Sequence, residues 1–270
     1  MDNGWEKKNN MKLSEFLIRF VFVRKCVSCD KILSYEDSES AFCPECVVKW
    51  RSAKTETCSV CFKSAVECSC MPKRLSHEGA LCLRKLVFYN KDKYGEPQNK
   101  IIYFLKRNKN SRAADFIARE LSEAIRSELE VLNADKENTV ITWVPRGLRA
   151  VSLYGFDQAC IICMSLEELL DIPAEDIIKR CRGGEEQKHL KRQERVKNIT
   201  GRFKIDRELS GKNIVLLDDV VTTGASMAEC VKLLRKAGAA SVICVSIAQD
   251  RCRQRKIFIF YNTTKYSLAI

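Results

Sequence analysis

Residues 214–226, IVLLDDVVTTGAS, constrain the fold of this 270-residue chain more than any other segment. Four consecutive aliphatic residues predict an interior strand of a parallel sheet, because such strands are buried on both faces. Asp218 and Asp219 then emerge at the carboxyl end, and a hydroxyl-rich turn leads directly into a helix. Open parallel sheets bind ligands at this edge, so the segment predicts both a fold class and a ligand site.

Strand-like and helix-like segments alternate over the last two thirds of the chain. Short β-branched and aliphatic runs predict strands over residues 80–90, 139–145, 211–219 and 239–249. Apolar residues recurring every three or four positions predict helices over 98–110, 111–132, 156–172 and 224–238, the second of them capped by Ser111. This alternation predicts an α/β domain whose sheet is largely parallel.

Eight of the 15 cysteines fall between residues 26 and 70, as CVSC, CPEC, CSVC and CSC. Paired cysteines at this spacing point two thiolates at one tetrahedral ion, so four pairs predict two structural Zn²⁺ sites. Chain order assigns Cys26, Cys29, Cys43 and Cys46 to one ion and Cys58, Cys61, Cys68 and Cys70 to the other. Crossed pairing and reduced thiols without metal remain alternatives. We expect a module over residues 1–79 and a second domain over residues 80–270.

Two further cysteines, Cys160 and Cys163, lie one helical turn apart in an apolar run. Core packing is the favoured interpretation over a redox pair.

The turn after the strand has the composition of a phosphate site. Free backbone N–H groups at a helix start converge there with the hydroxyls of Thr222, Thr223 and Ser226, and Gly224 permits close approach. Two carboxylates beside a phosphate would repel it unless they face another part of the same ligand. A vicinal diol fits, so the segment predicts a ribose 5-phosphate. The alternative is that the acids only cap the next helix.

This pattern resembles the signature of the type I phosphoribosyltransferases, whose substrate is phosphoribosyl pyrophosphate (PRPP). The order of a Cys-rich ribbon, VPRGLRAVSLYGFDQA, QKHLKRQERVKNITGRF and the signature is similar to the ComF family. The resemblance implies a type I phosphoribosyltransferase fold and transfer of phosphoribose to a nitrogen acceptor with Mg²⁺. It assigns the ribose hydroxyls to Asp218 and Asp219 and the pyrophosphate to a loop with Arg146. The 5-phosphate is assigned to Val220, Val221, Thr222, Thr223, Gly224, Ala225 and Ser226.

Basic residues are concentrated between residues 179 and 207, where eleven Lys and Arg face four Asp and Glu. The family resemblance implies a loop that closes over the substrate here, with Lys188, Arg192 and Arg195 as candidate contacts. The alternative for each is an ordinary solvated charge.

A formal net charge of +12 also keeps single-stranded DNA as a candidate partner, with Trp50 or Phe62 available for stacking. Some ComF members act in DNA uptake, so competence machinery is a second candidate partner. Three functions therefore compete: a phosphoribosyltransferase, a non-catalytic PRPP or nucleotide sensor that binds DNA, and a degenerate structural partner. The intact acid pair and phosphate turn argue against the last.

The apolar run FLIRFVFV near the start is interrupted by Arg19 and too short to span a bilayer. We therefore expect a cytoplasmic protein without membrane insertion.

Overall fold

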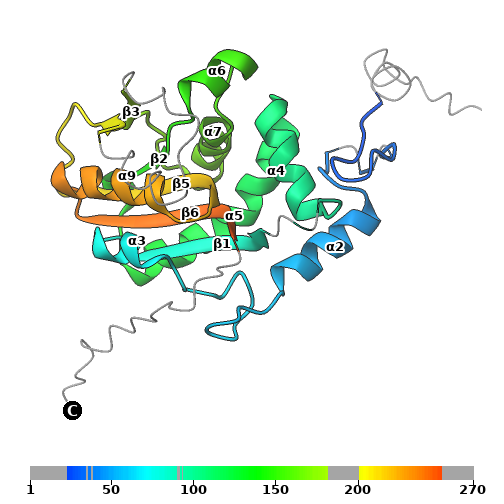
Figure 1. Cartoon of the computed structure of the whole chain (residues 1–270), viewed down its shortest axis with the longest axis horizontal. Helices are drawn as coiled ribbons and strands as arrows, with labels where there is room; N and C mark the ends of the chain where they lie inside the picture. Colours follow the sequence, from blue (N-terminus) through cyan, green and yellow to red (C-terminus); the bar gives the residue numbers. More distant parts are fainter. Residues whose placement is uncertain are drawn as a thin grey trace, which may run out of the picture.

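The computed structural model describes residues 23–181 and 201–250, except residues 35, 38, 90, 91 and 93. Its centre is a parallel sheet of four strands in the order β1-β6-β5-β2 (Figure 1). The strands are β1 (Cys82–Tyr89), β2 (Thr139–Trp143), β5 (Asn213–Val221) and β6 (Ser241–Asp250). The predicted parallel α/β arrangement is confirmed, with β5 between two neighbours as an interior strand requires.

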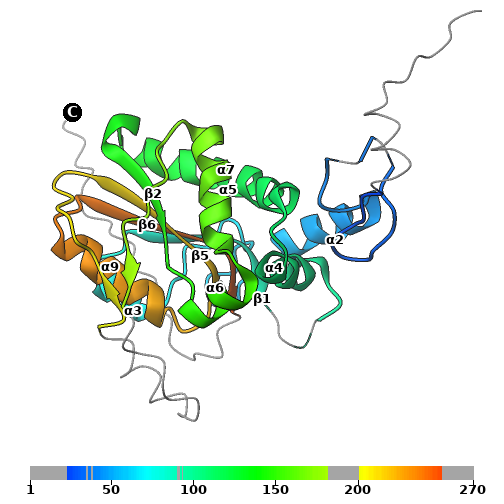
Figure 2. The same ribbon diagram turned by 90° about the horizontal axis from the view of Figure 1, so that it is seen from above.

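Helices cover both faces of this sheet (Figure 2). The helices α5 (Ser111–Val131) and α7 (Gln158–Leu170) pack on one face, in a core that contains Val215 and Leu217 of β5. The helix α9 (Ala225–Lys236) and the short α3 (Lys73–His77) lie on the other, with Ile214 and Leu216. Alternate residues of β5 therefore serve opposite cores, which explains its unbroken aliphatic run.

Two local expectations need correction. The N-cap of α5 is Asn110, whose side-chain oxygen accepts a hydrogen bond from the Ala113 N–H, and Ser111 is the first helical residue. Both residue types cap well, so composition alone could not choose between neighbours. The strand β5 continues past both acids to Val221, because its pairing with β6 extends as far as Gln249.

Several short elements carry no strong periodicity and were not expected. They include α2 (Pro44–Lys54), which begins directly after Cys43, and α6 (Leu148–Tyr154). A 3₁₀ turn (Lys136–Asn138) precedes β2, and β3 (Lys179–Arg180) pairs antiparallel with β4 (Phe203–Lys204). The predicted helix α4 (Pro97–Arg107) is present and lies beside α2 (Figure 1).

The cysteine-rich segment packs directly on the sheet domain. Phe42 and Trp50 meet Phe116 of α5 with ring centroids 5.2 and 5.6 Å apart. The Trp50 indole N–H also donates to Glu120 of α5 at 3.1 Å. The two parts thus share an apolar core, and a domain boundary at residue 79 stays a prediction.

Among the helices that the structure describes, none combines the length and apolarity needed to cross a membrane.

Candidate functional site

The candidate ligand site lies where strand β5 extends beyond the end of its neighbour β2. The register pairs Trp143, the last residue of β2, with Leu217, and the Val144 N–H donates to the Leu217 carbonyl at 2.9 Å. The residues from Asp218 onward therefore have no β2 strand beside them, while β6 still supports them on the other side. Ile214 to Leu217 are fully buried, so the first polar side chains of β5 after this run appear at the open edge.

The two adjacent acids have different surroundings, as the alternation along a strand requires. Asp219 is 9% exposed, and its Oδ2 accepts from the Gln158 amide at 2.7 Å and pairs with Lys106 at 3.1 Å. Asp218 accepts from the backbone N–H of Asp219 at 2.9 Å and is half-buried. Burial, and then the charge of Asp219, raise the pKa of Asp218 well above its ordinary value.

The predicted phosphate turn connects β5 to α9. Gly224 is the N-cap of α9 with φ 69°, a left-handed conformation that favours glycine. The helix is 12 residues long, and its first N–H groups have no intrahelical acceptor, so they face the turn with the positive end of the helix dipole. Thr222 is exposed, whereas Thr223 and Ser226 are half-buried. These three hydroxyl side chains and the start of α9 therefore belong to one short turn, and its role as a phosphate site stays a prediction.

Arg146 lies in the loop between β2 and α6. Its backbone N–H donates to the Asp157 carboxylate at 2.7 Å, and Asp157 also caps α7 through the Ala159 N–H. Its guanidinium donates to the Lys106 carbonyl at 2.7 Å and lies 4.8 Å from the centre of the Tyr154 ring. The loop is therefore tied to both α4 and α7.

Two residues at the acid pair were not selected from the sequence. Gln158 begins α7 and belongs to the YGFDQA segment, which carried the family resemblance without assigning this residue a role. Lys106, at the end of α4, has no local signal, because only the fold brings it to Asp219.

The predicted contacts Lys188, Arg192 and Arg195 lie outside the described residues.

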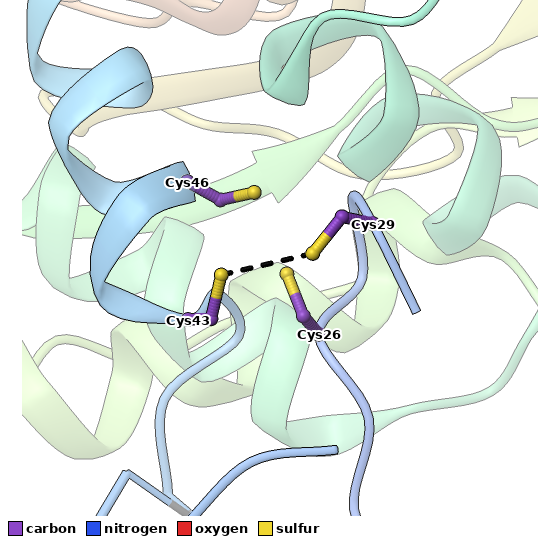
Figure 3. Close-up of side chains that lie close together, drawn as sticks. All are labelled: Cys26, Cys29, Cys43 and Cys46. Carbon is purple, nitrogen blue, oxygen red and sulfur yellow. Dashed lines mark hydrogen bonds between the residues drawn. The ribbon is translucent and has the colours of Figure 1, made fainter. Parts of the chain in front are cut away.

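The eight N-terminal cysteines form two separate groups. Within each group the four sulfur atoms lie within 4.8 Å of one another, in the chain-order sets Cys26, Cys29, Cys43, Cys46 and Cys58, Cys61, Cys68, Cys70. Figure 3 shows the first set converging, with Cys43 and Cys46 at the start of α2 and the Cys29 and Cys43 sulfurs 3.7 Å apart. Tetrahedral Zn–S bonds of about 2.3 Å place sulfurs about 3.8 Å apart. Each group could hold one metal ion, and the crossed pairing is excluded.

The other aromatic and cysteine predictions have mixed outcomes. Trp50 as a stacking platform is wrong, because it is 1% exposed and its ring packs against Phe42 and Phe116. Phe62 is 79% exposed, so it stays a candidate for stacking on the bases of single-stranded DNA. Cys163 is fully buried and lies 3.8 Å from the Thr142 carbonyl, which confirms a packing role.

Residues 158–267 match the family model for the phosphoribosyl transferase domain. The chain is 31% identical over 155 residues to the DNA utilization protein YhgH of Escherichia coli K12, covering 55% of this chain and 66% of that protein. It is 32% identical over 115 residues to Competence protein F of Haemophilus influenzae, covering 38% of this chain and 50% of that protein.

Among solved structures, a purine phosphoribosyltransferase from Pyrococcus horikoshii overlaps 50% of this chain and 83% of its own, at 20% identity and a TM-score of 0.31. The assignment therefore rests on the family model and the curated relatives. The match to YhgH spans just under two thirds of that protein's length. Residues 158–267 of this chain match the phosphoribosyl transferase domain, and the chain is a distant homologue of the DNA utilization protein YhgH and of Competence protein F.

Proposed function

We propose that this protein binds PRPP and transfers its phosphoribosyl group to a nitrogen acceptor with release of pyrophosphate. The observation that carries the proposal is the meeting of the acid pair and the phosphate turn at the open edge of β5. A ligand with a phosphate at one end and a sugar diol next to it matches both parts.

The 5-phosphate is placed on residues 220–226. The hydroxyls of Thr222, Thr223 and Ser226 and the first N–H groups of α9 would donate to its oxygens. Gly224 lets the chain turn at a positive φ before the helix begins. Val220 and Val221 end β5 just before this turn, Ala225 begins α9 just after it, and the side chains of all three are half-buried or buried.

The ribose hydroxyls are placed at Asp218 and Asp219. Asp219 already has two partners, so a hydroxyl would join or replace Lys106, which sits at 3.1 Å. A lysine there offsets the repulsion between the acids and a polyanionic ligand. Arg146, with Lys188 and Arg195 as predicted additions, is assigned to the pyrophosphate.

In the transfer step the acceptor nitrogen forms a bond to the anomeric carbon while the bond from that carbon to the pyrophosphate oxygen breaks. The departing pyrophosphate takes the electron pair, and the acceptor loses a proton. Mg²⁺ bound with the substrate beside the acids would spread the leaving group's charge. Asp218 and Asp219 would orient the sugar, and the negative charge of Asp219 would stabilise positive charge developing on the ring.

We assign the two four-cysteine groups to structural Zn²⁺. Four thiolates and no other ligand close the coordination sphere, which leaves no open position for catalysis. Their fit to zinc rests on the sulfur spacing described above.

A second candidate function is binding of single-stranded DNA by a PRPP-sensing protein. The curated relatives are named for DNA utilization and competence, and the exposed Phe62 ring provides a stacking surface.

Calorimetric titration with Mg²⁺ and PRPP tests the first proposal. We expect saturable binding by the wild-type chain, and at least a tenfold loss in Asp218→Asn, about 1.4 kcal/mol. Asp171→Asn is the matched control, because Asp171 caps the far end of α7 with a 93% exposed side chain. Unchanged affinity in Asp218→Asn would contradict the ribose assignment.

Pyrophosphate release against a panel of base and amine acceptors then separates the two functions. Release of pyrophosphate with any of these acceptors supports the phosphoribosyltransferase function. Tight PRPP binding without release, together with salt-sensitive binding of a single-stranded oligonucleotide that is lost in Phe62→Ala, would favour the sensor.

A further inference from the structure

A lysine is buried at the junction of the second cysteine group and the sheet. Lys85 lies in β1 and is 2% exposed. Its ammonium donates to the backbone carbonyls of Cys68 at 2.6 Å and Cys70 at 3.0 Å. Among the ion pairs of the described residues, none joins Lys85 to a carboxylate. A buried ammonium is costly without a nearby negative charge.

The second cysteine group supplies that charge when a divalent ion is bound. Four thiolates around one dication carry a net charge of −2, and the lysine faces the two carbonyls that belong to their ligand backbone. Cys58, Cys68 and Cys70 also share a small apolar core with Phe88, three residues further along β1. The group is therefore attached to β1 by charge and by packing.

The same group leads directly to the phosphate turn. Pro72 follows Cys70 by two residues, and a Cβ placed on Gly224 would lie 3.0 Å from its Cγ and 3.1 Å from its Cβ. Leu75 of α3 is fully buried and lies 3.4 Å from the same point. The turn at Gly224 thus rests on the chain that leaves the second cysteine group.

The first cysteine group is attached elsewhere. Its segment packs Phe42 and Trp50 on Phe116 of α5, and Lys54 pairs with Glu120 at 2.6 Å. None of the close neighbours of Gly224 belongs to this segment.

We propose that the second metal site supports the phosphate-binding turn: with its ion bound and Lys85 as counter-charge, it holds Pro72 and α3 against Gly224. Loss of the second ion loosens residues 222–226, whereas loss of the first does not. The inference concerns the turn assigned to phosphate above, so it rests on the proposed function only for its effect on ligand affinity.

Two paired variants test this. Cys68→Ser with Cys70→Ser removes ligands of the second ion, and Cys43→Ser with Cys46→Ser is the matched control at the first. Each is expected to keep one of two zinc ions by elemental analysis. Hydrogen exchange of peptides covering residues 220–228 should then rise roughly tenfold or more in the first variant and stay unchanged in the control. Equal exchange in the two variants would overturn the inference.

Pro72→Gly provides a test that does not depend on metal loss. It should retain both zinc ions yet speed exchange in the same peptides, because it removes the two carbons that lie nearest to the point where a Cβ of residue 224 would be. If the Cys68/Cys70 variant fails to fold, protection of the turn in Pro72→Gly equal to that in the wild type overturns the proposal. Lys85→Met should lower the zinc content from two ions to one, and retention of both ions would refute the counter-charge role.

Calorimetry with Mg²⁺ and PRPP separates failure of this inference from failure of the proposed function. At least a tenfold weaker affinity in the second-site variant, with wild-type affinity in the control, supports both. If the wild type binds no PRPP but the exchange difference persists, the structural coupling stands and the ligand assignment fails.

Discussion

Replacing Gly224 by alanine should destabilise the protein for two separable reasons. The residue has φ 69°, and a left-handed backbone costs an alanine roughly 1–2 kcal/mol. The added Cβ would also lie 3.0 Å from Pro72 Cγ, and overpacking of this kind costs typically about 1–3 kcal/mol. We therefore expect a loss of about 2–5 kcal/mol in the free energy of unfolding.

The chain offers a matched control. Gly211 has φ 76° and nothing within 4 Å of an added Cβ, so Gly211→Ala should show the backbone cost alone. Urea denaturation at fixed free zinc measures both variants, and the comparison requires equal m-values. Equal losses would refute the packing argument.

A double-mutant cycle isolates the contact itself. Pro72→Gly removes both carbons that the new methyl group would meet, so the Gly224→Ala change should cost at least about 1 kcal/mol less in its presence. Additive losses would show that the strain lies in the backbone and not between these two residues.

Three further outcomes are expected. Trp50→Phe should lower stability by about 1–2 kcal/mol in thermal melts, because it leaves a part-buried acceptor without its indole N–H, whereas Phe62→Ala should be nearly neutral. Gln158→Leu should cost about 1–3 kcal/mol in urea, because Asp219 loses a donor at 2.7 Å; an unchanged midpoint would contradict this. The raised pKa of Asp218 means that the folded state holds this proton more strongly than the unfolded state does. The stability that this group contributes is therefore complete below its unfolded pKa of about 4 and is lost as pH rises from there to the folded pKa. Asp218→Asn should therefore gain stability relative to the wild type between pH 5 and pH 8, and a constant difference would contradict the burial argument.

The parts of the fold with strong periodicity could be predicted from the sequence. The aliphatic run before Asp218 defined an interior strand, and it lies between β6 and β2 as expected. The chain-order cysteine sets also followed from spacing, because each pair closes its own turn. Signals of this kind are local, and local geometry is what a sequence pattern records.

The contacts that complete the site are long-range and had no such signal. Lys106 pairs with Asp219, which lies more than a hundred residues later in the sequence. Pro72 lies beside the Cβ position of Gly224, although most of the sheet domain's sequence separates the two residues. Trp50 was expected at the surface because aromatic residues bind nucleic acids, yet its ring is buried against Phe116 of α5. Burial of a large ring depends on the partners that the tertiary fold provides, and these cannot be read from its neighbours in the chain.

The strand order also dictates when the protein can finish folding. The edge strand β1 lies near residue 85, but its sheet neighbour β6 does not begin until Ser241. A chain emerging from the ribosome therefore presents β1 unpaired until nearly all of the sheet domain has been synthesised. The long separation predicts slow closure of the sheet, and hence a nascent chain that depends on protection of its exposed apolar strand until β6 has been synthesised.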